Sequence, residues 1–198
     1  MKRQLAVAVI MLMIFLFNLP VYAGVPTDTV QANVNKVLDV LRDPKLKPAS
    51  AKAIKKEKLR PIYERMFDDV ELSRRTLARN WNSLNAAQRQ EFVQLFRQVL
   101  EKAYIDKILS YTNEKIVFDR ESTLSENQVE VQTRVVTASK EIPISYRMIL
   151  KNGTWKVYDV VIENVSLILN YRTQFNEILA KNSPEQLLVT LRQKVKEH

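Results

Sequence analysis

The stretch from Trp155 to Phe175 changes its hydrophobic period from that of a strand to that of a helix. Residues 155–162 are rich in β-branched and aromatic side chains, which suit the half-buried surface of a sheet. Between residues 167 and 178, apolar side chains recur at the three- and four-residue spacing of one helix face. Ser166 is the expected N-cap between the two elements. The sequence therefore predicts a strand that passes directly into a helix lying over the sheet, which makes either a packed core or a pocket.

Three further strands are predicted before this stretch, at residues 115–120, 128–138 and 141–150. The second and third alternate apolar and polar side chains, as a half-buried strand does. Asn152 and Gly153 then give the strongest short signal for a tight hairpin turn. These features predict an antiparallel meander that ends in the strand from Trp155.

Helical patterns flank the meander on both sides. The basic segment at 45–60 is expected to be helical from Pro48, with Pro61 interrupting or restarting the helix. The helix at 86–110 has a wide aromatic face that we expect to pack on the sheet. The other expected helix signals are Thr27 or Thr29 capping a helix that ends at Asp43-Pro44, a start at Asp68-Asp69, an Asn85 cap, and a Ser183 cap before Pro184. Segregated helices and strands predict an α+β domain with helices covering a curved antiparallel sheet.

The first residues resemble a secretory signal peptide. Lys2 and Arg3 precede a mostly apolar run from 5 to 19, and residues 21–23 form a small-x-small cleavage site. We expect residues 1–23 to be removed after Ala23 and residues 24–198 to form a single exported domain; an uncleaved anchor is the alternative. The chain has no cysteine, so its core alone must stabilise it.

The composition excludes most standard catalytic sites. The only histidine is His198, and the chain contains no cysteine and two glycines, which disfavours Ser-His-Asp catalysis, thiolate metal sites and glycine-rich phosphate loops. We therefore expect no metal and no cofactor. Asp159, within an apolar strand, could be a buried acid, or it could bond a backbone turn or pair with a basic residue such as Arg172. The net charge of +9 would suit nucleic acid, but the export signal and the apolar setting of the strand aromatics argue against it.

The stretch from Trp155 to Phe175 resembles the signature of the MlaC family, also called the toluene-tolerance auxiliary family. The resemblance extends over nearly all of residues 24–198. Two positions depart from the family pattern, because Ala78 and Asn164 stand where glycine is common. The other segments that are similar to the family are Leu59–Tyr63, Phe67–Asp68, Leu77–Trp81 and Ala87–Phe92, with Phe96, Leu100 and Tyr104.

The resemblance implies a periplasmic phospholipid carrier of Gram-negative bacteria, with a nuclear-transport-factor-like sheet and helices that enclose an apolar cavity. It also implies that the cargo lipid moves between an outer-membrane lipoprotein complex and an inner-membrane ABC transporter, which maintains outer-membrane lipid asymmetry. A monomer with no cofactor other than the cargo is expected.

The sheet face and the adjoining helices supply the residues that we expect to contact lipid. Plain core packing is the alternative for each of them. The expected lipid-binding residues are Tyr104, Val131, Val135, Ile144, Tyr146, Met148, Val160, Ile162, Leu167 and Tyr171.

Basic helices supply the expected contacts with partners, and a solvated helix face is the alternative. The expected docking residues are Lys52, Lys55, Lys56, Arg74 and Arg75. Two other functions stay open on sequence alone. One is a non-enzymatic envelope protein-interaction module without a ligand, and the other is an enzyme that uses Asp159 as its acid or base.

Overall fold

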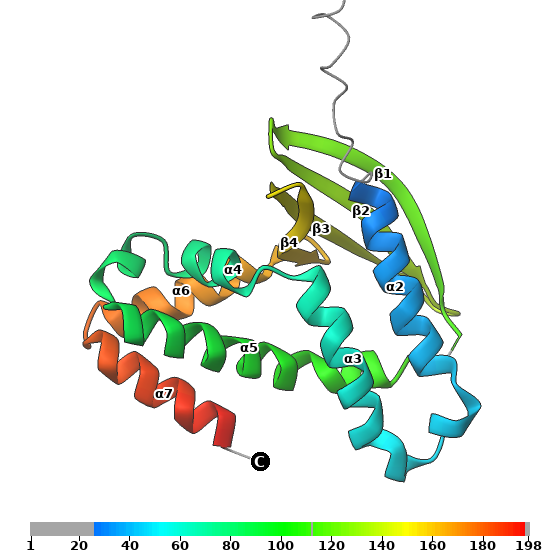
Figure 1. Ribbon diagram of the computed structural model, residues 1–198, viewed down its shortest axis with the longest axis horizontal. Helices are drawn as coiled ribbons and strands as arrows, with labels where there is room; N and C mark the ends of the chain where they lie inside the picture. Colours follow the sequence, from blue (N-terminus) through cyan, green and yellow to red (C-terminus); the bar gives the residue numbers. More distant parts are fainter. Residues whose placement is uncertain (1–25, 112, 197–198) are drawn as a thin grey trace, which may run out of the picture.

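The computed structural model describes residues 26–111 and 113–196, so the predicted signal peptide lies outside the described residues. The described residues form six α-helices and a five-stranded antiparallel sheet in the order β1-β2-β3-β4-β5. The sheet occupies one end of the molecule, helices α4 to α7 pack together at the other, and α2 crosses the sheet (Figure 1). The predicted α+β architecture is confirmed. None of the helices described is both long and apolar enough to cross a bilayer.

The strands follow the predicted meander closely. Their bounds are β1 Lys115–Ser125, β2 Gln128–Val136, β3 Glu141–Lys151, β4 Thr154–Ile162 and the two-residue β5 Val165–Ser166. Asn152 and Gly153 have φ values of 49° and 74°, so both occupy the left-handed region that an Asn-Gly hairpin turn requires. Glu163 and Asn164 have φ values of 49° and 67° and make a second such turn into β5, which the sequence did not predict.

A bulge in β4 distributes its side chains between two cores. Arg147 of β3 pairs with Asp159, while the next residue, Met148, pairs with Val157, so Tyr158 has no partner in the ladder. Val157 packs on the face of the sheet that α2 covers, whereas Tyr158 belongs to the other apolar cluster, which helices α4 to α7 form.

Helix α2, Pro26–Arg42, begins one residue before the predicted caps. Thr27 and Thr29 therefore lie inside its first turn, and the prediction that either one caps the helix is wrong because Pro26 occupies an early helical position. Thr27 instead donates both its N–H and its hydroxyl to Glu121 Oε2, at 3.1 and 2.7 Å. These bonds tie α2 to β1.

Helix α3, Lys52–Met66, follows two 3₁₀ turns, Pro44–Leu46 and Ala49–Ala51. It continues through Pro61, so the prediction that this proline interrupts or restarts the helix is wrong. Its C-terminal carbonyl groups are satisfied from the sheet, because Lys156 Nζ donates to the backbone oxygens of Glu64 and Arg65.

The remaining helices begin close to their predicted caps. Asp68 accepts a hydrogen bond from the Glu71 N–H at 2.8 Å at the start of α4, and Ser166 accepts one from the Leu169 N–H at 3.2 Å at the start of α6. The bounds are α4 Asp69–Leu77, α5 Ala86–Leu109, α6 Leu167–Leu179 and α7 Pro184–Lys196, with a 3₁₀ segment η4, Ala78–Ser83, between α4 and α5.

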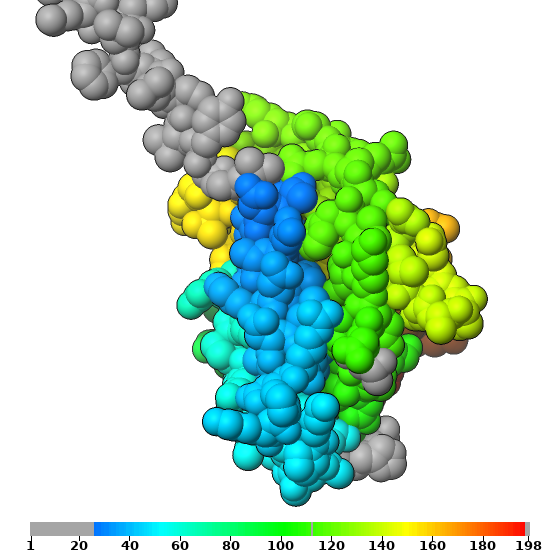
Figure 2. Space-filling view, turned by 90° about the vertical axis from the view of Figure 1, so that its right-hand side faces the viewer, coloured from blue at the N-terminus to red at the C-terminus, as the bar shows by residue number. Residues whose placement is uncertain are grey.

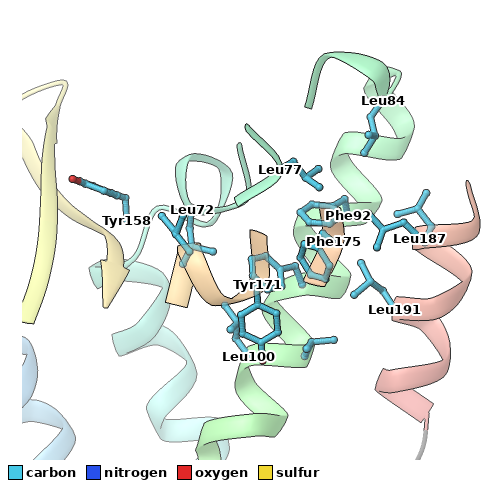
Figure 3. Close-up of a cluster of buried hydrophobic side chains, with 14 residues drawn as sticks. Leu72, Leu77, Leu84, Phe92, Leu100, Tyr158, Tyr171, Phe175, Leu187 and Leu191 are labelled. Atoms are coloured by element: carbon cyan, nitrogen blue, oxygen red, sulfur yellow. The ribbon is translucent and has the colours of Figure 1, made fainter. Parts of the chain in front are cut away.

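The aromatic face of α5 packs on other helices, so the prediction that it packs on the sheet is wrong. Phe92 and Phe96 of α5 meet Phe175 of α6 with ring centroids 5.5 and 5.2 Å apart (Figure 3 labels Phe92 and Phe175). Leu187 and Leu191 of α7 close the other side and are fully buried. We call this the helical cluster, and its buried members are Leu72, Leu77, Leu84, Phe92, Phe96, Val99, Leu100, Tyr158, Ile168, Tyr171, Phe175, Leu187, Leu188 and Leu191.

Candidate functional site

A second apolar cluster covers one face of the sheet. We call it the sheet-face cluster; its buried members are Val30, Val34, Leu38, Met66, Val129, Val131, Met148, Val157, Val160 and Leu167. Partly buried apolar side chains pack against it, namely Phe67, Tyr104, Tyr111, Ile116, Phe118, Ile144, Tyr146, Trp155 and Ile162. The strand register explains the grouping, because Val131 pairs with Tyr146, and Tyr146 in turn pairs with Val160.

The structure brings eight of the ten expected lipid-contacting residues into or against the sheet-face cluster. The eight are Tyr104, Val131, Ile144, Tyr146, Met148, Val160, Ile162 and Leu167. Val135 lies at the end of the same face in the strand register, where it is half-buried, and belongs to neither cluster. Tyr171 lies in the helical cluster, 5.0 Å from Phe96 between ring centroids.

Exposure rises along the strands from the middle of this face toward the turn at 137–140. In β3, Met148 is fully buried, whereas Tyr146 and Ile144 are half-buried. In β2 and β4 the same change occurs, so that Val135 and Ile162 are half-buried although the residues that precede them on this face are covered. The apolar face is therefore fully buried at the middle of the strands, at Met148 and Val157, and only partly covered toward the turn at 137–140; Leu150 and Trp155, beside the turn at 152–153, are also half-buried.

The covering side chains come from α2 and from the end of α3. Val30, Val34 and Leu38 of α2 are buried against the sheet, together with Met66. Phe67 packs against both clusters. The apolar spacing of α2 was visible in the sequence, but nothing in the pattern showed which surface it would cover.

Three tyrosines near this region have hydroxyl groups without a hydrogen-bond partner among the described residues: Tyr104, Tyr146 and Tyr171. Burial raises the pKa of Tyr146 to about 12, which reflects apolar surroundings rather than a nearby charge. Burial also raises the pKa of Tyr171, and the neighbouring Tyr104 adds to that shift. Tyr104 packs against both clusters and so lies where they meet.

Asp159 anchors the start of α6 to the sheet. The Ser166 hydroxyl donates to its Oδ2 at 2.6 Å, and the Ile168 N–H donates to its Oδ1 at 3.1 Å. The prediction of a backbone bond or a basic partner is confirmed, and the basic partner is Arg147, at 3.4 Å, rather than Arg172. Burial raises the pKa of Asp159, although these three donors favour its charged form. The geometry gives this carboxylate a structural use.

The expected docking residues fall into two groups. Lys52 pairs with Asp106 at 2.8 Å and is exposed, with Lys55 and Lys56 on the same helix. Arg74 and Arg75 instead each form an ion pair with Glu71 of the same helix, α4, at 2.7 Å.

Arg75 also stacks over the Tyr158 ring, with Cζ 4.0 Å from the ring centroid. Arg75 therefore links α4 to β4, whereas Arg74 pairs only within α4 among the contacts described; neither role could be read from the sequence, because Glu71 precedes both arginines by ordinary helical spacing.

Two surface hollows lie outside the sheet-face cluster. One of about 410 Å³ is lined mainly by polar residues of the α3–α4 junction and the β3–β4 hairpin, including Asp68, Lys151 and Lys156. The other, of about 360 Å³, lies between η4 and the end of α6 and includes Arg79, Asn80 and Glu177. Neither lining suits hydrocarbon. No group of acidic side chains or histidines in the described part of the chain could hold a metal ion.

Comparison with known proteins gives matches along most of the chain. A model of the MlaC protein family matches residues 31–193. The intermembrane phospholipid transport system binding protein MlaC of Haemophilus influenzae is 28% identical over 124 residues, which are 60% of this chain and 58% of that protein. The toluene tolerance protein ttg2D of Pseudomonas putida is 24% identical over 166 residues, 83% of this chain and 77% of that one.

A solved structure has the same fold. It is a phospholipid-binding protein from Ralstonia solanacearum in complex with a phospholipid, with a TM-score of 0.80 and 20% identity. The superposition covers 88% of this chain and 98% of the Ralstonia chain. At this identity the match establishes a shared fold over almost the whole of both chains.

Proposed function

The chain belongs to the MlaC family, and from that premise we propose that it is a phospholipid carrier that holds acyl chains against the partly covered end of its sheet-face cluster. The residues proposed to contact lipid there are Ile144, Tyr146 and Ile162, which the sequence indicated. Tyr104, at the boundary with the helical cluster, is proposed to contact it as well. Val135 extends the same face. Tyr171 is proposed to support Tyr104 from behind rather than to line the site.

The observation that carries the proposal is the change in exposure along the sheet face. Ile144, Tyr146 and Ile162 continue the rows of the fully buried core residues, yet their side chains are only half-buried. A contiguous apolar surface that a folded chain leaves partly uncovered is typical of a ligand-binding surface. Each methylene group that leaves water there would contribute about 0.8 kcal/mol, so acyl chains are a strongly favoured occupant.

The relatives support the choice of ligand. The Ralstonia protein of the same fold contains a phospholipid, and the Haemophilus relative is named as a phospholipid transport binding protein. The Haemophilus match spans 58% of that relative, so its cargo and partners come to this chain only as part of the proposal.

Carriage between membranes follows from the energetics of the tails. Two acyl chains removed from water would be released slowly on their own, because the sum over their methylene groups exceeds ordinary binding energies. We therefore propose that partner proteins assist loading and unloading, at an outer-membrane lipoprotein complex and an inner-membrane ABC transporter. The carrier would act in the periplasm as a monomer, formed by residues 24–198 after removal of the signal peptide, and would maintain outer-membrane lipid asymmetry.

The test is to place a charge on the partly covered end of the face. Tyr146→Lys and Ile144→Lys should each lose most of the copurifying phospholipid, as measured by mass spectrometry of lipid extracts, while retaining the native circular dichroism spectrum. Half-buried positions are chosen because Met148 is fully buried, and a lysine there would unfold the core whatever the ligand.

The matched control lies in the other core. Leu191→Ala removes a fully buried side chain from the helical cluster and should cost about 3 kcal/mol of stability without changing the lipid content. Undiminished phospholipid in both lysine variants would show that this face is not the binding surface. Absence of lipid from the unmodified protein would favour the alternative of an interaction module without a ligand.

A further inference from the structure

A basic lobe carries more than half of the net charge of the chain. We define it as residues 43–60, which include η2, η3 and the first half of α3. Seven of these residues are lysine or arginine and two are acidic, so the lobe contributes +5 to the formal net charge of +9. In Figure 2 this segment, in cyan, forms the lower end of the molecule.

Most of the lysine charge in the lobe is not neutralised by neighbouring carboxylates. Asp43 lies 3.9 Å from Lys58, and Glu57 lies 3.3 Å from Arg60, so each acidic residue of the lobe already has a basic partner. Among the described residues outside the lobe, one carboxylate forms an ion pair with it: Asp106 of α5 lies 2.8 Å from Lys52.

Within the part of the chain that the structure describes, four lysines of the lobe form no ion pair: Lys45, Lys47, Lys55 and Lys56. Lys56 also lies near Asp106, where it helps Lys52 to lower the pKa of that carboxyl.

The placement of these charges opposes helix formation. Helix α3 starts at Lys52 and has Lys55 and Lys56 in its first two turns, with no acidic residue in the first turn and no side-chain N-cap. Cations near a helix N-terminus are unfavourable because they face the positive end of the helix dipole. The charges of Lys55 and Lys56 therefore do not favour the start of α3, and an external anion would relieve the repulsion.

The lobe also presents an exposed apolar side chain. Between residues 44 and 58 only Leu46 and Ala51 are buried, and Ile54 is 51% exposed beside Lys55. The lobe contains no aromatic residue and a single arginine, Arg60. Hot spots of protein–protein interfaces are rich in tryptophan, tyrosine and arginine, whereas lysines around an exposed aliphatic side chain suit the interface of an anionic bilayer.

We propose that the basic lobe binds the surface of an anionic phospholipid bilayer, with Lys45, Lys47 and Lys55 on the lipid phosphates and Ile54 in the interfacial layer. The inference rests on the proposed function only in requiring that the protein meets membranes. The proposed bilayer-binding surface, at the N-terminal end of α3, is distinct from the sheet face that is proposed to hold the cargo. The binding is electrostatic and weakens as the salt concentration rises.

Flotation with lipid vesicles tests the proposal. The purified protein without its signal peptide, residues 24–198, should bind vesicles that contain phosphatidylglycerol and should not bind vesicles of pure phosphatidylcholine. The triple variant Lys45→Glu/Lys47→Glu/Lys55→Glu should bind the anionic vesicles at least about a hundredfold more weakly, because each lysine near such a surface contributes roughly fivefold. Ile54→Ser should lower the fraction that stays bound at high salt.

A second triple variant with the same change in net charge is the control, and it should lose less than about tenfold. Its positions are exposed lysines outside the lobe with no ion pair among the described residues: Lys36→Glu, Lys181→Glu and Lys194→Glu. Equal losses in the two triple variants would overturn the proposal, because general charge would then explain the binding. Absence of binding to anionic vesicles would also overturn it and would favour an acidic protein as the partner.

Phospholipid content measured on the same lobe variants should be unchanged. This measurement separates the two proposals. If the lipid-carrier proposal is wrong, the purified protein contains no phospholipid; if the lobe inference is wrong, the phospholipid content is normal and only the expected vesicle binding fails.

Discussion

Glu71 of α4 forms ion pairs with three basic side chains. Arg74, Arg75 and Lys151 all donate hydrogen bonds to its carboxylate, and its side chain is only 4% exposed. Burial alone raises the pKa of Glu71, but the hydrogen bonds from Arg74, Arg75 and Lys151 outweigh it and lower the pKa to about 2. The contact with Lys151 joins α4 to the β3–β4 hairpin, together with Asp68, which lies 2.7 Å from the same lysine.

Removing the Glu71 charge should therefore destabilise the protein in a pH-dependent way. Glu71→Gln should cost about 2 kcal/mol at pH 7, less than for a fully buried pair because the basic partners reach water. Since the folded pKa lies below the ordinary value of 4.5, the contribution is present above pH 4.5 and is lost as the pH falls toward 2. Urea unfolding at several pH values measures the difference.

The exposed pair of Glu57 and Arg60 provides the control, and Glu57→Gln should change stability by less than about 0.5 kcal/mol. A penalty for Glu71→Gln that stayed constant from pH 7 to pH 2 would contradict this account of the ion pairs.

Ala78 holds a backbone conformation that favours glycine. At the end of α4 it has a φ of 49° and a ψ of −123°, a region that side chains with a Cβ rarely occupy. Ala78→Gly should therefore raise the free energy of unfolding by about 1 kcal/mol in thermal or urea denaturation. Ala103→Gly, at an exposed position inside α5, should lower it by about 1 kcal/mol. Loss of stability in both variants would show that the strain at Ala78 is absent.

At the scale of elements, the sequence predicted what depends on local chemistry. The Asn-Gly turn, the caps at Asn85 and Ser166 and the alternating strands are determined by hydrogen bonds or side-chain periods within a few residues, and all were found. Packing partners depend on the whole fold. The apolar face of α5 therefore gave no indication that it would meet α6 and α7, and the continuation of α3 through Pro61 was not predicted.

The capping box of α5 gives a test at this scale. Asn85 accepts from the Gln88 N–H at 2.9 Å, and its own N–H donates to the Gln88 side chain at 3.1 Å. Asn85→Ala should cost about 1 kcal/mol in urea unfolding because one helix N–H loses its acceptor. Asn82→Ala, in the exposed η4 segment, should be nearly neutral. Equal costs for the two variants would mean that the cap contributes nothing specific.

At the scale of the whole molecule, the two apolar clusters differ in how completely they are covered. The helical cluster is closed by interlocking rings of Phe92, Phe96, Tyr171 and Phe175, whereas the sheet-face cluster is fully buried at the middle of the strands and only partly covered toward the turn at 137–140. Sequence periodicity identified most of the residues on the sheet face. It could not show where the covering by α2 stops, because exposure depends on how distant segments meet, and it wrongly favoured the sheet as the partner of α5.

The central claim is that the partly covered sheet face holds phospholipid, and native mass spectrometry of the protein purified from cells tests it most directly. The account predicts that folded ions of the protein carry the added mass of a phospholipid, and that this added mass is missing from Tyr146→Lys. Folded ions without any added lipid mass, or the same lipid on both proteins, would contradict it.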